Sequence, residues 1–225
     1  MKKFPIYLLL FLFVVLLYFG ITRKEKHTSP KNLKILSERD SFDLKEGDIL
    51  ARPNWSWLPG SCPVPAGRKY GHVAVVIKGA CGASIGEALE NAIVVEALFF
   101  DQATKEFQFK KENQIREGKA IVSFGSKFSG IRYRLRISLT EEQKKTITGF
   151  VRSQLDGGYN ILSVKRKQAN DEKMKNLDWH CATLVWQAYY LATGLDIDAN
   201  DGLFIYPSDI IASPVFDNPD GIVRF

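Results

Sequence analysis

The stretch Ile131-Arg-Tyr-Arg-Leu-Arg-Ile-Ser-Leu-Thr-Glu-Glu-Gln143 contains the point at which the hydrophobic period of the chain changes. Its first seven residues alternate strictly, with apolar side chains at odd positions and arginine at even ones, which predicts a β-strand with one solvated face. Its last four residues form a capping box, which predicts the start of a helix. Strands are predicted before this point and helices after it. The sequence therefore favours an α+β domain, an antiparallel sheet packed against helices.

Four further strands are predicted upstream. They are β-branched or apolar runs, at Asp48–Arg52, His72–Lys78, Ile93–Phe99 and Lys119–Phe124. A loop rich in proline and glycine, residues 53–71, follows the first of them. Trp57 in this loop is a candidate for contact with a substrate, although such aromatic side chains more often pack a loop onto its domain.

Two helices are predicted downstream. The first begins at the capping box and keeps helical spacing of its apolar residues up to Gly157. The second runs from about His180 to Thr193, and Gly194 supplies its stop. Cys181 then lies in the first turn of a helix, where free N–H groups and the positive end of the helix dipole lower a thiol pKa and bind an anion.

Cys181 is therefore a candidate nucleophile, the alternative being a buried structural cysteine. Its base is predicted to be His72, at the start of a strand, because His27 falls in a polar linker and His180 adjoins the cysteine on a helix, where neighbouring side chains do not face each other. A satisfied core or edge histidine fits the same pattern for His72. Glu96 interrupts an apolar strand and is the candidate group to orient the imidazole, unless it points to solvent. Weaker candidates for that role are Asp48 and Glu87.

The 225-residue chain begins with an uncharged run of 17 residues, Phe4–Gly20, with basic residues on both sides. Extended to Thr22 as a helix, it covers about 28 Å, close to the ~30 Å core of a bilayer. We expect residues 1–22 to be a signal peptide or a transmembrane anchor, and the protein to be exported to the cell envelope, membrane-anchored or periplasmic. Residues 23–40 are expected to form a linker and residues 41–225 one domain.

Charge and cysteine content narrow the classes of function. The chain has 31 Lys and Arg against 25 Asp and Glu, a net charge of +6, which is too small an excess to indicate nucleic-acid binding. Common nucleotide and zinc motifs are absent from the sequence, so no cofactor or metal is expected. Three cysteines in an exported protein suggest one disulfide and one free thiol. Cys62 and Cys81, in surroundings rich in proline and glycine, are expected to pair and to leave Cys181 free.

Six short motifs occur in order along the domain. They are Gly47-Asp-Ile-Leu50, Gly71-His-Val-Ala-Val-Val76, Val95-Glu-Ala97, Tyr159-Asn160, Trp179-His-Cys-Ala-Thr-Leu-Val-Trp186 and Tyr206-Pro-Ser-Asp-Ile210. This set resembles the circularly permuted NlpC/P60 papain-like cysteine hydrolases of the YiiX type. The resemblance implies a permuted papain-like α+β fold, with Cys181 as nucleophile, His72 as base and Glu96 as the polar third member. One departure from the family pattern is that His180 and Ala182 flank the nucleophile.

The resemblance implies thiol hydrolysis of an amide, such as a cell-wall peptide, by an acyl-enzyme mechanism. Two alternatives stay open: a lipid esterase or acyltransferase of the same fold, and a non-catalytic envelope binding domain. The expected partners are a peptide or acyl-lipid substrate and the membrane, through the N-terminal segment, with the protein a monomer. The candidate substrate-binding residues are Tyr206, Trp57 and Tyr159.

Overall fold

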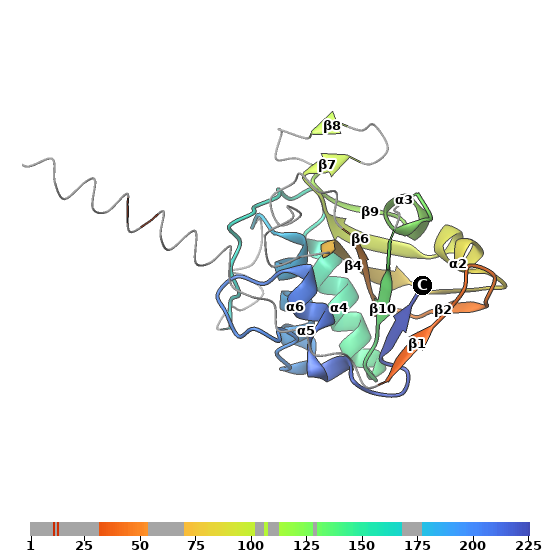
Figure 1. Cartoon of the computed structure of the whole chain (residues 1–225). Helices are drawn as coiled ribbons and strands as arrows, with labels where there is room; N and C mark the ends of the chain where they lie inside the picture. Colours follow the sequence, from red (N-terminus) through yellow and green to blue (C-terminus); the bar gives the residue numbers. More distant parts are fainter. Residues whose placement is uncertain are drawn as a thin grey trace, which may run out of the picture.

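The computed structural model describes residues 32–53, 70–101, 106–107, 113–127, 130–167 and 177–225, together with Phe11 and Phe13. At the centre of this part lies a seven-stranded sheet of order β1-β11-β10-β3-β4-β6-β9 (Figure 1). Neighbouring strands are antiparallel, except for the parallel pair β1 and β11. The strands are β1 (Leu33–Ile35), β3 (Ile49–Pro53), β4 (Tyr70–Lys78), β6 (Ile93–Ala97), β9 (Ile115–Lys119), β10 (Tyr133–Leu135) and β11 (Ile222–Arg224). Two short pairs add β2 (Phe42–Leu44) with β5 (Ala80–Gly82), and β7 (Phe100–Asp101) with β8 (Glu106–Phe107).

Helices cover both faces of the sheet. On one face lie α4 (Glu141–Ser153), α5 (Cys181–Thr193), α6 (Pro207–Ile211) and the 3-10 turn Pro214–Phe216. On the other face lie α2 (Ile85–Asn91) and α3 (Ala120–Phe124). Because successive residues of a strand face opposite sides, Val73 and Val75 of β4 pack with α5, while Ala74 and Val76 pack with α2. The mixed α+β class predicted from the change of period is confirmed.

The helix boundaries follow local signals in the sequence. Thr140 accepts a hydrogen bond from the Gln143 backbone, and the Gln143 side chain accepts one from the Thr140 backbone, so the predicted capping box is formed. At the end of α5, Gly194 adopts a positive φ of 70°, a conformation that glycine takes without steric cost. These two signals mark the start of α4 and the end of α5 without reference to tertiary contacts.

The predicted strand Lys119–Phe124 is wrong. Strand β9 ends at Lys119, and Ala120–Phe124 forms the short helix α3. A short apolar run is compatible with either structure, and here tertiary contacts decide, because Ala120 and Phe124 are buried against the α2 side of the sheet and the Ala120 N–H donates to the Ala92 carbonyl. This helix supplies two side chains to the site described below.

The predicted solvated face of the arginine strand is also wrong. Strand β10 lies between β11 and β3, and Arg132 and Arg134 are buried. Arg134 donates to the carbonyl oxygen and the carboxylate of Asp220, at 2.7 and 2.8 Å. Arg132 donates to the Phe124 carbonyl at 2.8 Å and lies over the Phe225 ring. Burial of these arginines is possible because each guanidinium finds several partners.

The central sheet includes a strand from the segment that was expected to be a linker. Residues 23–40, expected to be a linker, contribute strand β1, in which Leu33 pairs with Ile222 of β11. The expected signal or anchor segment, residues 1–22, lies outside the described residues except for Phe11 and Phe13. In the part of the chain that is described, no helix combines the length and apolar character needed to cross a membrane.

Candidate active site

Cys181 lies in the first turn of α5, as predicted, but the helix begins one residue later than expected, so Cys181 is its first residue and His180 is the N-cap. Cys181 is 1% exposed, and the backbone N–H groups of Val73, at the start of β4, and of Ala182, the next residue of α5, act to lower the pKa of its thiol. A helix N-terminus offers unsatisfied N–H groups to a negative charge. The position therefore suits a sulfur that has to carry a negative charge during a reaction.

His72 and Glu96 form a buried pair on neighbouring strands β4 and β6. His72 Nε2 lies 2.7 Å from Glu96 Oε2, and the two side chains are 2% and 4% exposed. Ser123 of α3 donates to Glu96 Oε1 at 2.7 Å, and the ring of Phe124 stacks on the His72 ring at 5.7 Å between centroids. Since Nε2 bonds to the carboxylate, it holds the ring proton, and Nδ1 is the nitrogen that can accept another.

The sulfur and the His72 ring lie at the same end of β4 without a direct hydrogen bond between them in the described structure. The two are linked through Val73, the neighbour of His72, whose backbone N–H acts to lower the pKa of Cys181. Among the hydrogen bonds of the described residues, the ring nitrogen that contacts the sulfur is instead His180 Nε2, at 3.8 Å. Catalytic hydrogen bonds are often loose in a resting site and tighten when substrate binds, so this geometry leaves His72 as a candidate base.

The resting thiol and imidazole are both neutral near pH 7. Burial raises the pKa of Cys181 to about 11, although the N–H groups of Val73 and Ala182 and the charge of Arg52 act in the opposite direction. Burial lowers the pKa of His72 below its ordinary value, and the charges of Arg52 and Arg116 add to this, against the effect of Glu96. The site therefore holds no thiolate–imidazolium ion pair before substrate arrives.

Glu96 is ionised in this setting. Burial raises the pKa of this carboxyl, but the hydrogen bond with His72, the charges of His72 and Arg116 and the hydrogen bond from Ser123 outweigh burial, and the net shift is downward. Arg116 Nε lies 3.6 Å from Glu96 Oε1. An ionised carboxylate at 2.7 Å favours the charged imidazole, so Glu96 is placed to stabilise His72 once it takes up a proton.

Arg52 is a charged residue of the site that the sequence reasoning missed. It is buried on β3 directly opposite His72 of β4, and its charge acts on Cys181, His72 and Glu96. Burial lowers its pKa to about 10, so it stays a cation at neutral pH. The available signal was a basic residue at the end of the apolar strand Ile49-Leu-Ala-Arg52, where burial of a charge needs a reason.

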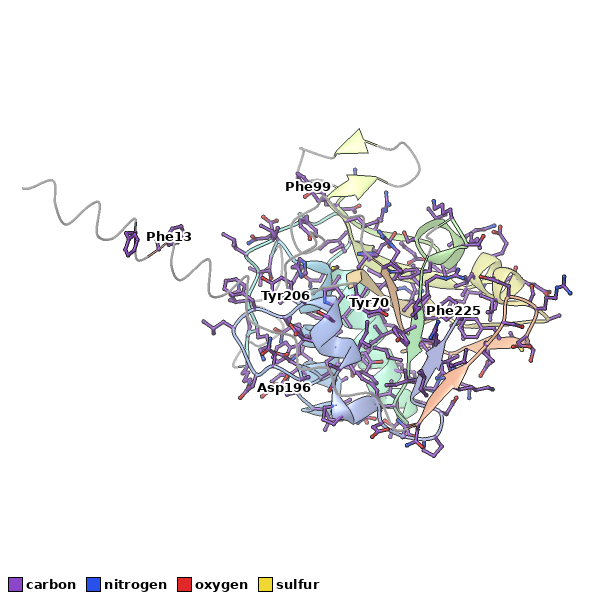
Figure 2. The ribbon with its side chains drawn as sticks, in the orientation of Figure 1. Phe13, Tyr70, Phe99, Asp196, Tyr206 and Phe225 are labelled. Atoms are coloured by element: carbon purple, nitrogen blue, oxygen red, sulfur yellow. The ribbon has the colours of Figure 1, made fainter. Side chains whose placement is uncertain are left out.

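Two of the predicted substrate-binding aromatics lie beside the cysteine helix. The rings of Tyr159 and Tyr206 meet the His180 ring edge to face, at 5.7 and 6.1 Å between centroids. Tyr159 also contacts the ring of Phe99, at 5.9 Å, and Figure 2 shows Phe99 beside strand β7; Tyr206 is the N-cap of α6. The third candidate, Trp57, lies outside the described residues.

The remaining candidates have other roles or lie apart. The carboxylate of Asp48 is buried against Arg136, and Glu87 accepts from the Ala83 backbone at the start of α2, so neither contacts His72. Cys81, on β5, is an exposed free thiol, and Cys62 lies outside the described residues. The pairing of these two cysteines stays a prediction, which alkylation without reduction followed by mass analysis would test. In the described ranges, no group of three or more His, Cys, Asp or Glu side chains is arranged to hold a metal ion.

Comparisons with known proteins show similarity to a curated protein and to a solved structure. No family model matches the chain. A stretch of 77 residues, 34% of this chain, is 32% identical to the uncharacterized protein YycO of Bacillus subtilis (strain 168) and covers 30% of that protein. The chain thus matches less than a third of the length of this relative. The structure is similar to the crystal structure of the metalloprotein yiiX from Escherichia coli O157:H7, with a TM-score of 0.48 and 14% identity, over 81% of this chain and 96% of that one.

Proposed function

We propose that the protein is a thiol hydrolase with a permuted papain-like fold, which cleaves an amide bond through an acyl-enzyme on Cys181. The observation that carries the proposal is a cysteine at a helix N-terminus, aimed at the start of a strand that bears a histidine bonded to a buried carboxylate at 2.7 Å. A nucleophile, a base and a group that orients the base are the three parts that nucleophilic acyl transfer requires.

The proposed reaction has two halves. In the first, His72 Nδ1 takes the proton from Cys181 as the sulfur attacks the carbonyl carbon, and the carbonyl electrons move to its oxygen. The C–N bond then breaks, the amine leaves with the proton from His72, and a thioester remains on Cys181. In the second half, water gives a proton to His72 and its oxygen displaces the sulfur, which recovers that proton as the acid leaves.

Backbone N–H groups at the start of α5 are the proposed donors to the oxyanion in both halves. Because the resting thiol and imidazole are neutral, proton transfer has to accompany attack, with Glu96 stabilising the imidazolium as it forms. Arg52 adds a buried positive charge that favours the anionic sulfur. Tyr159 and Tyr206 are proposed to contact the part of the substrate next to the scissile bond.

A lipid ester is the second candidate substrate, and three exposed apolar side chains favour it. Leu203, Leu162 and Ile161 are 71%, 56% and 40% exposed, and the two loops that carry them are joined by a hydrogen bond from the Lys165 N–H to the Leu203 carbonyl. These loops adjoin Tyr159 and Tyr206, so an acyl chain near the site would find apolar contacts.

The proposed location is the cell envelope, with a peptide or acyl-lipid substrate and attachment to the membrane through residues 1–22. This part of the proposal is supported by the uncharged run and its basic flanks. Fractionation of cells that express the full chain tests it, and recovery of the whole protein in the soluble cytoplasmic fraction would contradict it.

The experiment for the activity offers the full chain two substrate panels, cell-wall peptide fragments and lipid esters, and searches for an acyl adduct by mass. We expect an adduct on Cys181 with one panel, none with Cys181→Ala, and an unchanged adduct with the matched control Cys81→Ala, which removes an exposed cysteine on β5. An adduct from lipid esters alone would select the second candidate. Absence of both adduct and product in the unmodified protein would overturn the hydrolase and favour a binding domain.

A further inference from the structure

His180 occupies an unusual position as the N-cap of α5. Serine, threonine, aspartate and asparagine are the usual N-caps, because a short side-chain oxygen accepts from the first free N–H groups. Here the imidazole takes that role, since His180 Nδ1 accepts from the Ala182 N–H at 3.4 Å. The same ring places Nε2 at 3.8 Å from the sulfur of Cys181, and the side chain is buried.

The capping bond fixes which nitrogen carries the proton. In a neutral imidazole one nitrogen accepts and the other donates. Because His180 Nδ1 accepts from the Ala182 N–H, Nε2 holds the proton and its N–H points at the sulfur of Cys181. A nitrogen that already carries a proton is unable to take one from the thiol, so this ring donates to the sulfur and the base has to be another group.

The surroundings keep this ring neutral. The titratable groups that face it are Cys181 on its own helix, Tyr159 before the helix, Tyr206 at the start of α6 and His72 on β4. Burial, together with the smaller effect of positive charge on His72, lowers the pKa of His180 to about 4. None of these neighbours is a carboxylate, so the described surroundings offer no anion to stabilise an imidazolium.

We propose that His180 is a hydrogen-bond donor that stabilises the thiolate of Cys181 through its Nε2–H, and that His72 is left as the base. A hydrogen bond to an ion is stronger than one to a neutral group, so the bond strengthens as the sulfur gains charge. The effect on the thiol is independent of the substrate, and only the effect on turnover rests on the proposed function.

Two substitutions separate the functions of the two ring nitrogens. The amide oxygen of His180→Asn lies near the position of Nδ1 and can keep the cap, but the side chain is too short to donate to the sulfur. The amide of His180→Gln reaches the position of Nε2 and can keep a donor there, but it is no base. The pair therefore distinguishes a cap, a donor and a base at this position.

The test measures alkylation of Cys181 by iodoacetamide in the full chain between pH 7 and 10, read as the mass of the Cys181 peptide. In the unmodified protein we expect the rate to rise about tenfold per pH unit, because only the thiolate reacts and the thiol is mostly protonated in this range. In His180→Asn we expect a parallel line about tenfold slower, and in His180→Gln a rate within about threefold of the unmodified protein. Circular dichroism checks that each variant is folded.

Two outcomes would overturn the inference. One is a His180→Asn variant that is folded and reacts at the rate of the unmodified protein. The other is a His180→Gln variant as slow as His180→Asn, together with a ¹⁵N spectrum in which the protonated nitrogen of His180 is Nδ1. Failure of the proposed function can be distinguished from failure of this inference. The alkylation rates need no substrate, so they can be measured even if the protein turns over neither substrate panel.

Discussion

Replacement of His72 by alanine is expected to lower kcat/KM by at least about 10⁴-fold, as far as Cys181→Ala does, because nucleophile and base act as one unit. Without the ring, the thiol with its pKa of about 11 has no acceptor for its proton, and the helix N-terminus alone supplies too little thiolate at neutral pH. The measurement is turnover of whichever substrate panel gives the acyl adduct. A folded His72→Ala variant that keeps more than about a hundredth of the activity would contradict the role of this residue as base.

Substitutions of Glu96 are expected to lower the rate less than His72→Ala does, because Glu96 acts through the His72 ring. Glu96→Gln keeps a polar partner for His72 Nε2 and for the Ser123 hydroxyl but removes the charge, so a residual rate above that of His72→Ala is expected. Glu96→Ala should leave less, since it also removes the partner. The matched control is Ser123→Ala, which keeps the carboxylate charge and should cost the smallest part of the rate.

The parts of this site that follow local rules were predictable from the sequence. Cys181 opens a helix because a run with helical spacing and a glycine stop define α5 without tertiary information. His72 and Glu96 lie on neighbouring strands because two consecutive β-branched runs pair in an antiparallel sheet. Glu96, in the second run, could therefore be expected to reach His72 in the first.

Other parts depend on contacts between residues far apart in the chain. Ser123 reaches Glu96 only because Ala120–Phe124 is a helix, and an apolar run of that length does not distinguish a helix from a strand. The burial of Arg134 depends on β11, which comes from the other end of the domain. Nothing in the alternating stretch itself indicates that this strand will pair with it. Pattern alone shows which face is apolar, and it does not show that a charged face is covered.

His180 was rejected as the base because it adjoins Cys181 on a helix, but the rule about neighbouring helical side chains does not apply to this residue. Adjacent side chains of a helix point about 100° apart, but His180 has extended backbone angles, φ −79° and ψ 149°, because it is the N-cap and lies outside the helix. Its ring is therefore free of the helical direction and turns back over the first turn, toward Cys181 and Ala182. The rejection of His180 as a base is still supported, for the different reason that its capping bond fixes the proton on Nε2.

Loss of Arg136 is expected to give the largest loss of stability, because it leaves a buried carboxylate unpaired. Arg136 of the segment after β10 donates from Nε and Nη2 to the two oxygens of Asp48, at 2.6 and 2.7 Å, and the Asp48 side chain is 1% exposed. Burial raises the pKa of Asp48, and the bonds and charge of Arg136 are the main effects in the opposite direction. Breaking a buried pair from one side costs about 3–5 kcal/mol, so Arg136→Met should lower the free energy of unfolding by that amount in a urea titration.

The control and the pH dependence show whether the unpaired charge is the cause. Glu141→Gln breaks an exposed pair with Lys144 and should cost less than about 0.5 kcal/mol. In Arg136→Met, the folded pKa of Asp48 rises further above its unfolded value, so proton uptake favours the folded state and the defect should shrink as the pH falls from 7 toward 5. The double variant Asp48→Asn, Arg136→Met should recover part of the loss, because no buried charge remains. A defect in Arg136→Met that stays constant with pH would show that lost packing of the arginine stem, and not the carboxylate, destabilises the strand that carries Arg52 into the site.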